Sequence, residues 1–341
     1  MFNMKKPFLI VCLLALLIPL QGCTPREKTL APSAADQLFI KIMDQDYGTK
    51  AKTFWADNTL WIYLPDDNRE IFNIASNQKA SSSPVPRKFS LQYFEGSENA
   101  KTFLFEYDIV TATKAAAGVG ISTQYSEAFN TQYRNAVTAV TRAYFGAEKL
   151  PEFIVIVLSD VTKGIEIQNT ICALDLKKYY ASALSPDEYS LRVLSETKGD
   201  EEIVGDFKGH HLKIATVVWP EFLSKQIAQR VRYKFQNSSF PPEETPQNEI
   251  LKIIATTMMI YDFHDYDTVV LNDLRSSRAE NFTRSQVEAL EDKSILGKER
   301  KPTEGKIITI DFSKFLEEKP EESSPAEKTD APSSENSNTT P

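Results

Sequence analysis

An unbroken run of six apolar residues, Phe153–Leu158, constrains the fold of this chain more than any other segment. The run is short enough for a strand, and its repeated Ile and Val residues favour extended backbone. A strand with apolar side chains on both sides has no face to offer to water. We therefore predict a central strand that other elements cover on both faces.

Helical periodicity predicts the elements that would cover this strand. The clearest helix is expected over 124–146, where apolar side chains recur on one stripe and Gly146 follows as a stop signal. In the segment 247–262 apolar residues occupy much of the helical circumference, so that helix should be deeply buried. Further helices are predicted over 35–46, 175–183, 186–196, 220–236 and 284–292.

Strand signals alternate with these helices. Strands are predicted over 59–64, 70–74, 88–95, 101–110, 212–218, 266–272 and 306–312. The first two should pair as a hairpin across the turn-prone residues 65–68. In the third, Phe89, Leu91 and Tyr93 alternate with polar residues, which favours a half-buried antiparallel strand.

The order of these elements predicts an α+β fold, with a mainly antiparallel sheet and helices packed against it in a single large domain. Hydrophobic residues make up 41% of the chain and aromatic residues 11%, which is enough for a substantial core.

The N-terminus has the pattern of an export signal. Lys5 and Lys6 precede an apolar run over 8–20, which is too short to span a bilayer as a helix, for which about 20 apolar residues are needed. The run ends at Leu20-Gln21-Gly22-Cys23, which resembles the lipobox of bacterial lipoproteins. The resemblance covers residues 1–23 only.

The lipobox resemblance implies cleavage before Cys23, lipidation of its thiol with chains such as palmitate, and anchoring of the mature chain to a membrane. In lipoproteins of Gram-negative bacteria an aspartate after the cysteine favours retention in the inner membrane. The residue here is Thr24, so we expect a periplasm-facing protein of the cell envelope, with the outer membrane favoured.

The composition along the chain then suggests six segments. They are a signal peptide (1–22), a flexible tether after lipidated Cys23 (23–34), a globular α+β domain (35–274), a charged and partly ordered segment (275–305), a terminal strand region (306–316), and a disordered acidic tail rich in Pro, Ser and Thr (317–341).

Charge and cysteine content limit the classes of function. The formal charge is −8, and loss of Lys5 and Lys6 with the signal makes it −10, so no nucleic-acid partner is expected. With Cys12 removed and Cys23 lipidated, only Cys172 remains, so an intramolecular disulfide is not possible. We interpret Cys172 as a small buried hydrophobic residue rather than a nucleophile.

The densest polar group in the sequence surrounds Asp262, His264 and Asp267. Carboxylates next to a histidine can bind a divalent metal or form a general base. Zinc-binding helices usually carry a His-Glu-x-x-His spacing, which is absent here. The group also lies where a predicted helix meets a strand, a position at which Asp and His often serve as caps and turn residues. We favour that structural role and predict no resident metal or other cofactor.

Other candidates are weaker. We interpret His210 and His211 as an exposed turn, because adjacent residues in extended backbone point in opposite directions. The segment 117–120 carries Gly-x-Gly but neither a third glycine nor a phosphate-binding lysine, and we interpret it as a loop. The basic residues of 225–234 fit the outer side of a helix better than a lipid contact.

Three hypotheses about function follow. We favour a lipid-anchored envelope protein with a non-catalytic role in binding another protein or supporting an assembly. The first alternative is an envelope hydrolase or metal-dependent enzyme that uses Asp262, His264 and Asp267. The second alternative is a carrier of lipid or another apolar ligand, which would need an enclosed apolar cavity of roughly a few hundred Å³.

Overall fold

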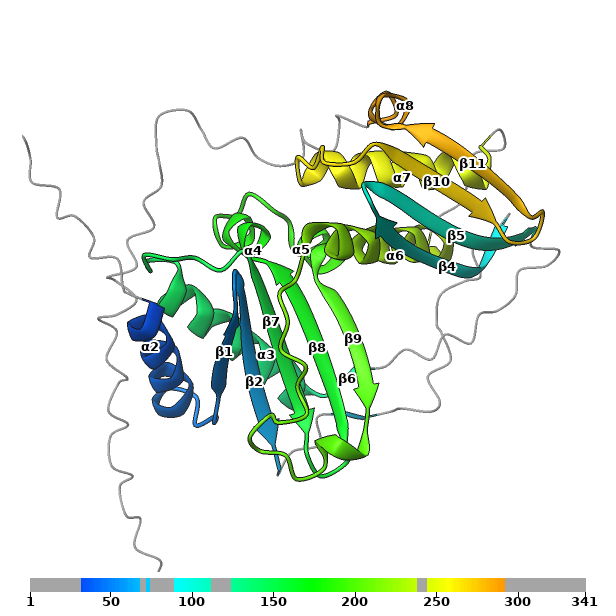
Figure 1. The fold of residues 1–341 in the computed structure, drawn as a ribbon. Helices are drawn as coiled ribbons and strands as arrows, with labels where there is room; N and C mark the ends of the chain where they lie inside the picture. The colour runs from blue at the N-terminus through cyan, green and yellow to red at the C-terminus, as the bar shows by residue number, and fades with distance from the viewer. Residues whose placement is uncertain (1–31, 68–71, 74–88, 112–123, 238–243, 292–341) are drawn as a thin grey trace, which may run out of the picture.

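The structure is a computed structural model that describes residues 32–67, 72–73, 89–111, 124–237 and 244–291. It confirms the predicted α+β class, with helices packed on mostly antiparallel sheets in what fits a single domain. The antiparallel strands are not gathered in one sheet: they form a five-stranded and a four-stranded sheet, which lie one above the other in Figure 1, and a two-stranded sheet.

The five-stranded sheet is built around the apolar run. Its order is β1 (Lys52–Ala56), β2 (Thr59–Asp66), β7 (Phe153–Asp160), β8 (Ile165–Cys172) and β9 (Leu194–Gly199). Strand β7 is central and all eight of its residues are buried, as predicted. It pairs in parallel with β2 and antiparallel with β8, so the run is enclosed by neighbours as well as by both covering layers.

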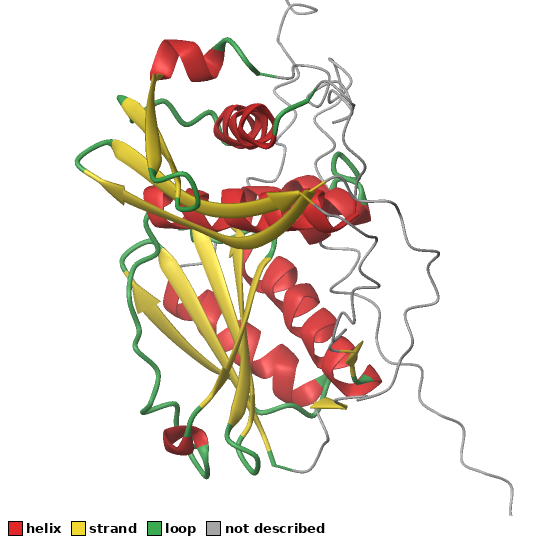
Figure 2. Cartoon of the chain, turned by 90° about the vertical axis from the view of Figure 1, so that its right-hand side faces the viewer, coloured by secondary structure: helices red, strands yellow, loops and turns green. Residues whose placement is uncertain are grey.

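The two faces of this sheet are covered in different ways. Helices α2 (Pro32–Gln45) and α3 (Glu127–Tyr144) pack on one face, where Phe39, Val140 and Ile156 share a core. The opposite face is crossed by residues 206–218, which we call the strap; Figure 2 shows the helices and this loop on opposite sides of the sheet. The strap packs Leu212, Ile214 and Val217 onto Trp61, Tyr63, Val155 and Val157.

The predicted strand at 212–218 is therefore wrong. The segment is extended but forms no ladder, because its position over the face of the sheet leaves no strand edge beside it. Side chains of the sheet satisfy its backbone instead: Trp61 Nε1 donates to Ala215 O at 2.8 Å, and Val217 N donates to Thr59 Oγ1 at 2.9 Å. A strand-like apolar pattern here belongs to a segment that covers the sheet rather than to a strand of it.

The four-stranded sheet has the order β11 (Arg278–Thr283), β10 (Thr268–Asp273), β5 (Thr102–Thr111) and β4 (Phe89–Asn99). Helices α6 (Trp219–Asn237) and α7 (Pro246–Ile260) contribute to one core with the inward side chains of these strands, among them Phe103, Phe105 and Val269. The prediction that the second of these helices is deeply buried is confirmed. A short helix, α8 (Arg284–Glu288), follows β11.

Four further predictions need correction. The expected hairpin of 59–64 with 70–74 does not form, because β2 pairs with β1 and β7, while β3 (Phe72–Asn73) pairs with β6 (Gln124–Tyr125). Helix α5 (Pro186–Arg192) follows α4 (Ala173–Tyr180) but ends before 194, where strand β9 begins. The helix expected over 124–146 begins only at Glu127, because Ser126 caps it and Gln124–Tyr125 pair as strand β6. Strands β1, β8, β9 and β11 were also not anticipated, since polar residues interrupt their apolar pattern.

Strand β4 also departs from its predicted alternation. A register shift between Leu91 and Tyr93 inserts an irregularity into the pairing with β5. After the shift the buried side chain is Phe94, at 2% exposure, and Tyr93 is exposed. The bulge therefore moves the inward face by one residue, which the alternation alone did not indicate. The predicted strand at 306–312 and the predicted tail at 317–341 lie outside the described residues.

Candidate functional site

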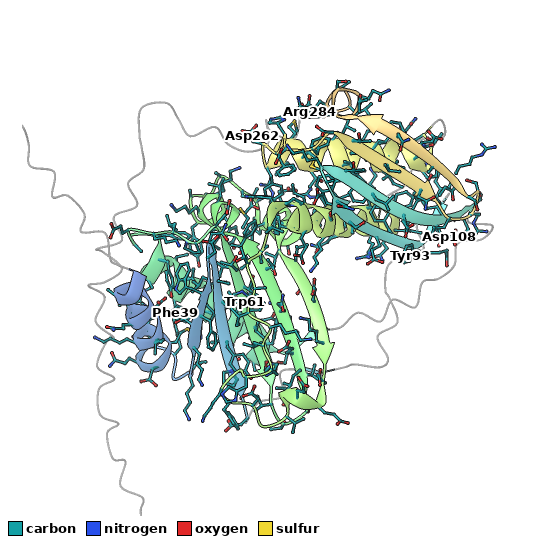
Figure 3. All side chains as sticks on the ribbon, in the orientation of Figure 1. Phe39, Trp61, Tyr93, Asp108, Asp262 and Arg284 are labelled. Carbon is teal, nitrogen blue, oxygen red and sulfur yellow. The ribbon has the colours of Figure 1, made fainter. Side chains whose placement is uncertain are left out.

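The segment around His264 forms the junction between α7 and β10. Asp262 has a positive φ of 50° directly after the helix C-cap residue Tyr261. His264 Nε2 lies 3.0 Å from Asp262 Oδ1, and its Nδ1 lies 3.1 Å from Glu288 Oε1 on α8. Both hydrogen bonds raise the pKa of His264, and the one with Asp262 has the larger effect. The His264 side chain remains 54% exposed, and Asp262 lies at an outer corner of the structure in Figure 3.

The third member of this predicted cluster is not brought to the histidine by any described contact. The Asp267 backbone N–H donates to Lys101 O, and Asp267 O accepts from Arg284 N. Within the described ranges no three His, Cys, Asp or Glu side chains gather closely enough to hold a metal ion. The structure does bring Asp262 and His264 together. They form a turn at the end of α7, and the Asp262 carboxylate is open to solvent.

The histidine pair divides between two environments. His210 is exposed, as predicted for a turn. His211 instead has a side chain only 7% exposed, and its Nδ1 and Nε2 lie 2.7 Å from Asp206 Oδ2 and 2.9 Å from Glu166 Oε2. The prediction of an exposed turn is therefore wrong for His211. Its imidazole fixes the strap to strand β8.

The environment of His211 favours the imidazolium form. Burial lowers its pKa, but the hydrogen bonds with Glu166 and Asp206 outweigh that effect and raise the pKa above the usual value. The pKa of Asp206 is lowered, because hydrogen bonds from the His211 backbone and ring outweigh the effect of burial. Tyr63 donates to Asp206 O at 2.5 Å, and burial raises the pKa of its phenol to about 12.

This buried set, consisting of Asp206, His211 and Glu166, holds the strap rather than presenting a general base. Both ring nitrogens are engaged, so neither is left to accept a proton from a substrate. Ser159 Oγ donates to Glu166 Oε2 at 3.2 Å and not to the histidine. A signal was available in the sequence: Gly205 and Gly209, both at a φ of 73°, frame a tight turn that returns the chain from Asp206 to His211.

A pocket of about 440 Å³ opens at the junction of the upper end of the five-stranded sheet with helices α4, α6 and α7. We call it the junction pocket. Figure 1 shows α4 at the upper end of the five-stranded sheet, close to the ends of α6 and α7. The residues that line the pocket are Leu150, Pro151, Glu152, Cys172, Ala173, Leu174, Asp175, Lys177, Lys178, Trp219, Ile260, Tyr261 and Asp262.

Two carboxylates in the walls of the junction pocket orient its aromatic rings. Glu152 Oε1 accepts from Trp219 Nε1 at 2.5 Å, and Glu152 Oε2 accepts from the amide of Asn58. Asp175 Oδ2 accepts from the Tyr261 hydroxyl at 2.8 Å. These bonds hold the rings of Trp219 and Tyr261 with their centroids 5.5 Å apart.

Arg192 is a buried residue beneath the junction pocket that connects α4 with α5. Its side chain is 1% exposed and donates from Nη1 to Asp175 Oδ1 at 2.8 Å and from Nε to Glu188 Oε1 at 2.9 Å. Arg230 of α6 donates to the same Glu188 oxygen at 2.7 Å. The predicted outer-side placement thus does not hold for Arg230, whose side chain is 12% exposed and paired inside the structure, whereas Lys225, 44% exposed, pairs with Glu196.

Cys172 is the N-cap residue of α4 and lines the junction pocket, yet it is only 2% exposed. Burial, with a further effect of Asp175, raises the pKa of its thiol to about 12. The thiol is therefore protonated at neutral pH, which disfavours a nucleophilic role. Cys23 and the Gly-x-Gly segment at 117–120 lie outside the described residues.

The two faces of the four-stranded sheet are covered unequally, since α6 and α7 pack on only one of them. Strand register places Tyr93, Glu95, Leu104, Glu106, Asp108, Val270 and Ala279 on the face opposite the core shared with α6 and α7. We call this the outer face. In the part of the chain that the structure describes no helix packs on it, and Figure 3 shows Tyr93 and Asp108 near one another at its margin.

The charges on the outer face are partly balanced. Glu106 accepts from the Asn272 amide at 3.0 Å, and Asp108 pairs with Arg275 at 2.9 Å. Glu95 is exposed. The face is thus a mixed polar and apolar surface with an acidic bias.

Comparisons with family models, with curated proteins and with solved structures found no match to this chain. No helix among the described residues combines the length and apolar character needed to cross a bilayer.

Proposed function

We propose that this chain is a lipid-anchored protein of the cell envelope, facing the periplasm, with a non-catalytic role in binding another protein. The observation that carries the proposal is the outer face of the four-stranded sheet. It places Leu104 and Val270 beside the carboxylates of Glu95 and Glu106, on a sheet face that no described helix covers. Lipid on Cys23 would hold this surface at the membrane.

The internal chemistry also favours binding over catalysis. His211 has both ring nitrogens engaged, the Cys172 thiol is protonated, and His264 belongs to an exposed helix terminus. A hydrolase that used Asp262, His264 and Asp267 would need those side chains to converge on one substrate atom. The described contacts unite only the first two.

Site-specific photocrosslinking in living cells tests the proposal. A photoreactive amino acid at Ala279, on the outer face, should capture one recurring envelope protein, while the same residue at Ile40 on α2 should not. Both positions are exposed, so they form a matched pair. Cys23→Ser should release the protein from the membrane and reduce capture at Ala279.

Absence of a product at Ala279, or the same products at both positions, would refute the outer face as the interface. A purified protein that turned over a small substrate and lost turnover in His264→Ala would instead favour the enzyme hypothesis.

A further inference from the structure

We propose that the strap is a pH-sensitive cover of the five-stranded sheet. It lies on the sheet while His211 is an imidazolium, and it separates from the sheet when that ring loses its proton. The cover is distinct from the outer face and does not depend on the proposed protein partner.

The strap is attached to the sheet by few contacts. It is extended but forms no ladder with any strand of the described chain, and its apolar side chains Leu212, Ile214 and Val217 are only partly buried. In its middle, Trp61 Nε1 donates to Ala215 O, a bond from a side chain of the sheet rather than from a neighbouring strand. Segments with few buried contacts open at a lower free energy than core strands. The strap can therefore separate while β2, β7 and β8 stay paired.

His211 supplies the cation that holds the cover in place. Its ring lies 2.9 Å from Glu166 of β8 and 2.7 Å from Asp206 of the strap, and the exposed fractions of these three side chains are 7%, 5% and 12%. An imidazolium donates to both carboxylates at once, which joins the strap to the sheet by two charge-assisted hydrogen bonds.

The other ionisable groups around the ring do not replace this cation. Tyr63 of β2 packs against the imidazole with ring centroids 5.6 Å apart, but its hydroxyl donates to Asp206 O, and burial raises the pKa of its phenol to about 12. Lys198 of β9 is the register partner of Glu166, yet it donates to Gln168. The remaining ionisable side chains of the strap are exposed: Lys208, His210 and Lys213.

Loss of the ring proton makes the closed arrangement unfavourable. A neutral imidazole donates from one nitrogen only, so one of the two carboxylates would face a nitrogen lone pair. Glu166 and Asp206 would also remain buried with no cation between them, which is costly. Opening of the strap carries Asp206 away from Glu166 and returns both carboxylates to water.

The pH at which the strap opens follows from the same contacts. Burial opposes the imidazolium, but the hydrogen bonds with Glu166 and Asp206 outweigh burial and raise the pKa of His211. The strap should therefore stay closed below the ordinary histidine value of about 6.5 and open at a pH above it.

Opening uncovers an apolar surface. Trp61, Tyr63, Val155 and Val157 lie beneath the strap, and none of them is more than 6% exposed while it is closed. Helices α2 and α3 pack on the other face of the sheet, so that core does not depend on the strap. The uncovered side chains form one apolar patch, the kind of surface that binds apolar molecules.

Acrylamide quenching of Trp61 fluorescence in the full chain measures the opening. Trp55→Phe with Trp219→Phe leaves Trp61 as the only tryptophan. Its quenching constant should rise about threefold or more between about pH 6 and about pH 9, because local opening admits the quencher. The far-UV circular dichroism should not change, because the strands stay paired. His210→Ala, at an exposed ring, is the matched control and should show the same rise.

Two replacements of His211 assign the rise to its charge. His211→Lys keeps a cation at both pH values, so Trp61 should stay shielded throughout. His211→Ala has no cation at either pH, so quenching should be high throughout. Hydrogen exchange of the chain with all three tryptophans gives a second measure: the protection factor of the Val217 amide should fall over the same pH range, and those of β7 should not.

The proposal is overturned if Trp61 quenching and Val217 protection are the same at both pH values. It is also overturned if circular dichroism is lost together with the shielding, which would show global unfolding, or if the pH-dependent rise persists in His211→Ala or His211→Lys.

Discussion

Replacing His211 with alanine should destabilise the protein far more than replacing its neighbour His210. The imidazole of His211 makes two charge-assisted hydrogen bonds, at 2.7 and 2.9 Å, and each of its carboxylate partners has a largely buried side chain. Its removal leaves Glu166 and Asp206 facing one another without a cation. Breaking a buried ion pair in this way costs about 3 to 5 kcal/mol of unfolding free energy.

Urea unfolding followed by tryptophan fluorescence measures this cost, because Trp61 lies under the strap and donates to Ala215 O. His210→Ala is the matched control: its side chain is exposed, and its unfolding free energy should stay within about 0.5 kcal/mol of the parent. Equal stabilities of the two variants would refute the assignment of His211 as the group that fastens the strap.

The same contacts predict a dependence on pH. The pKa of His211 is higher in the folded protein than the ordinary histidine value of about 6.5, so the folded state binds this proton more tightly. Its stabilising contribution is complete below that ordinary value and is lost as pH rises through the folded pKa. Asp206, whose pKa is lowered, contributes above its ordinary range and loses its effect as pH falls. His211→Ala should remove the decline at higher pH; a decline that persisted unchanged would assign it to another group.

Three further predictions concern the core. Arg192→Met should lower the unfolding free energy by about 3 kcal/mol in urea titrations, because it removes the buried guanidinium that Asp175 and Glu188 share. A change below about 0.5 kcal/mol would contradict this. Gly96→Ala should destabilise by about 1 to 3 kcal/mol, since a Cβ there would lie 2.5 Å from the Phe105 ring; an unchanged thermal midpoint would show that the ring moves freely. Cys172 should react with a thiol reagent only after unfolding, because its pKa is raised to about 12, and stoichiometric labelling of the native Cys23→Ser chain would contradict that.

Much of the secondary structure could be predicted from local pattern. The apolar run Phe153–Leu158 did become the central strand, and the segment predicted as a helix over 124–146 did become helix α3 from Glu127 onward. The predictions failed where a segment's environment, not its own pattern, selected its conformation. Residues 212–218 have a strand-like pattern but lie across a sheet face, and the bulge after Leu91 exchanged the inward and outward positions of β4.

The candidate sites show the same division. The polar residues from Asp262 to Asp267 attracted attention because they are adjacent in sequence, yet the structure uses Asp262 and His264 as a helix terminus. The contact of His211 with Glu166 joins residues 45 positions apart, and no local pattern indicates it.

The sequence by itself determined the chain's class: an apolar central strand, amphipathic helices that must cover it, and a lipobox-like leader that predicts anchoring at Cys23. These properties depend on short-range periodicity and composition, which a single segment carries. Only the tertiary structure decided that there are two main sheets rather than one, that the strap closes over Trp61 and Tyr63, and that a pocket opens at the junction. Those outcomes depend on which distant surfaces exclude water from one another, and that is a property of the whole folded chain.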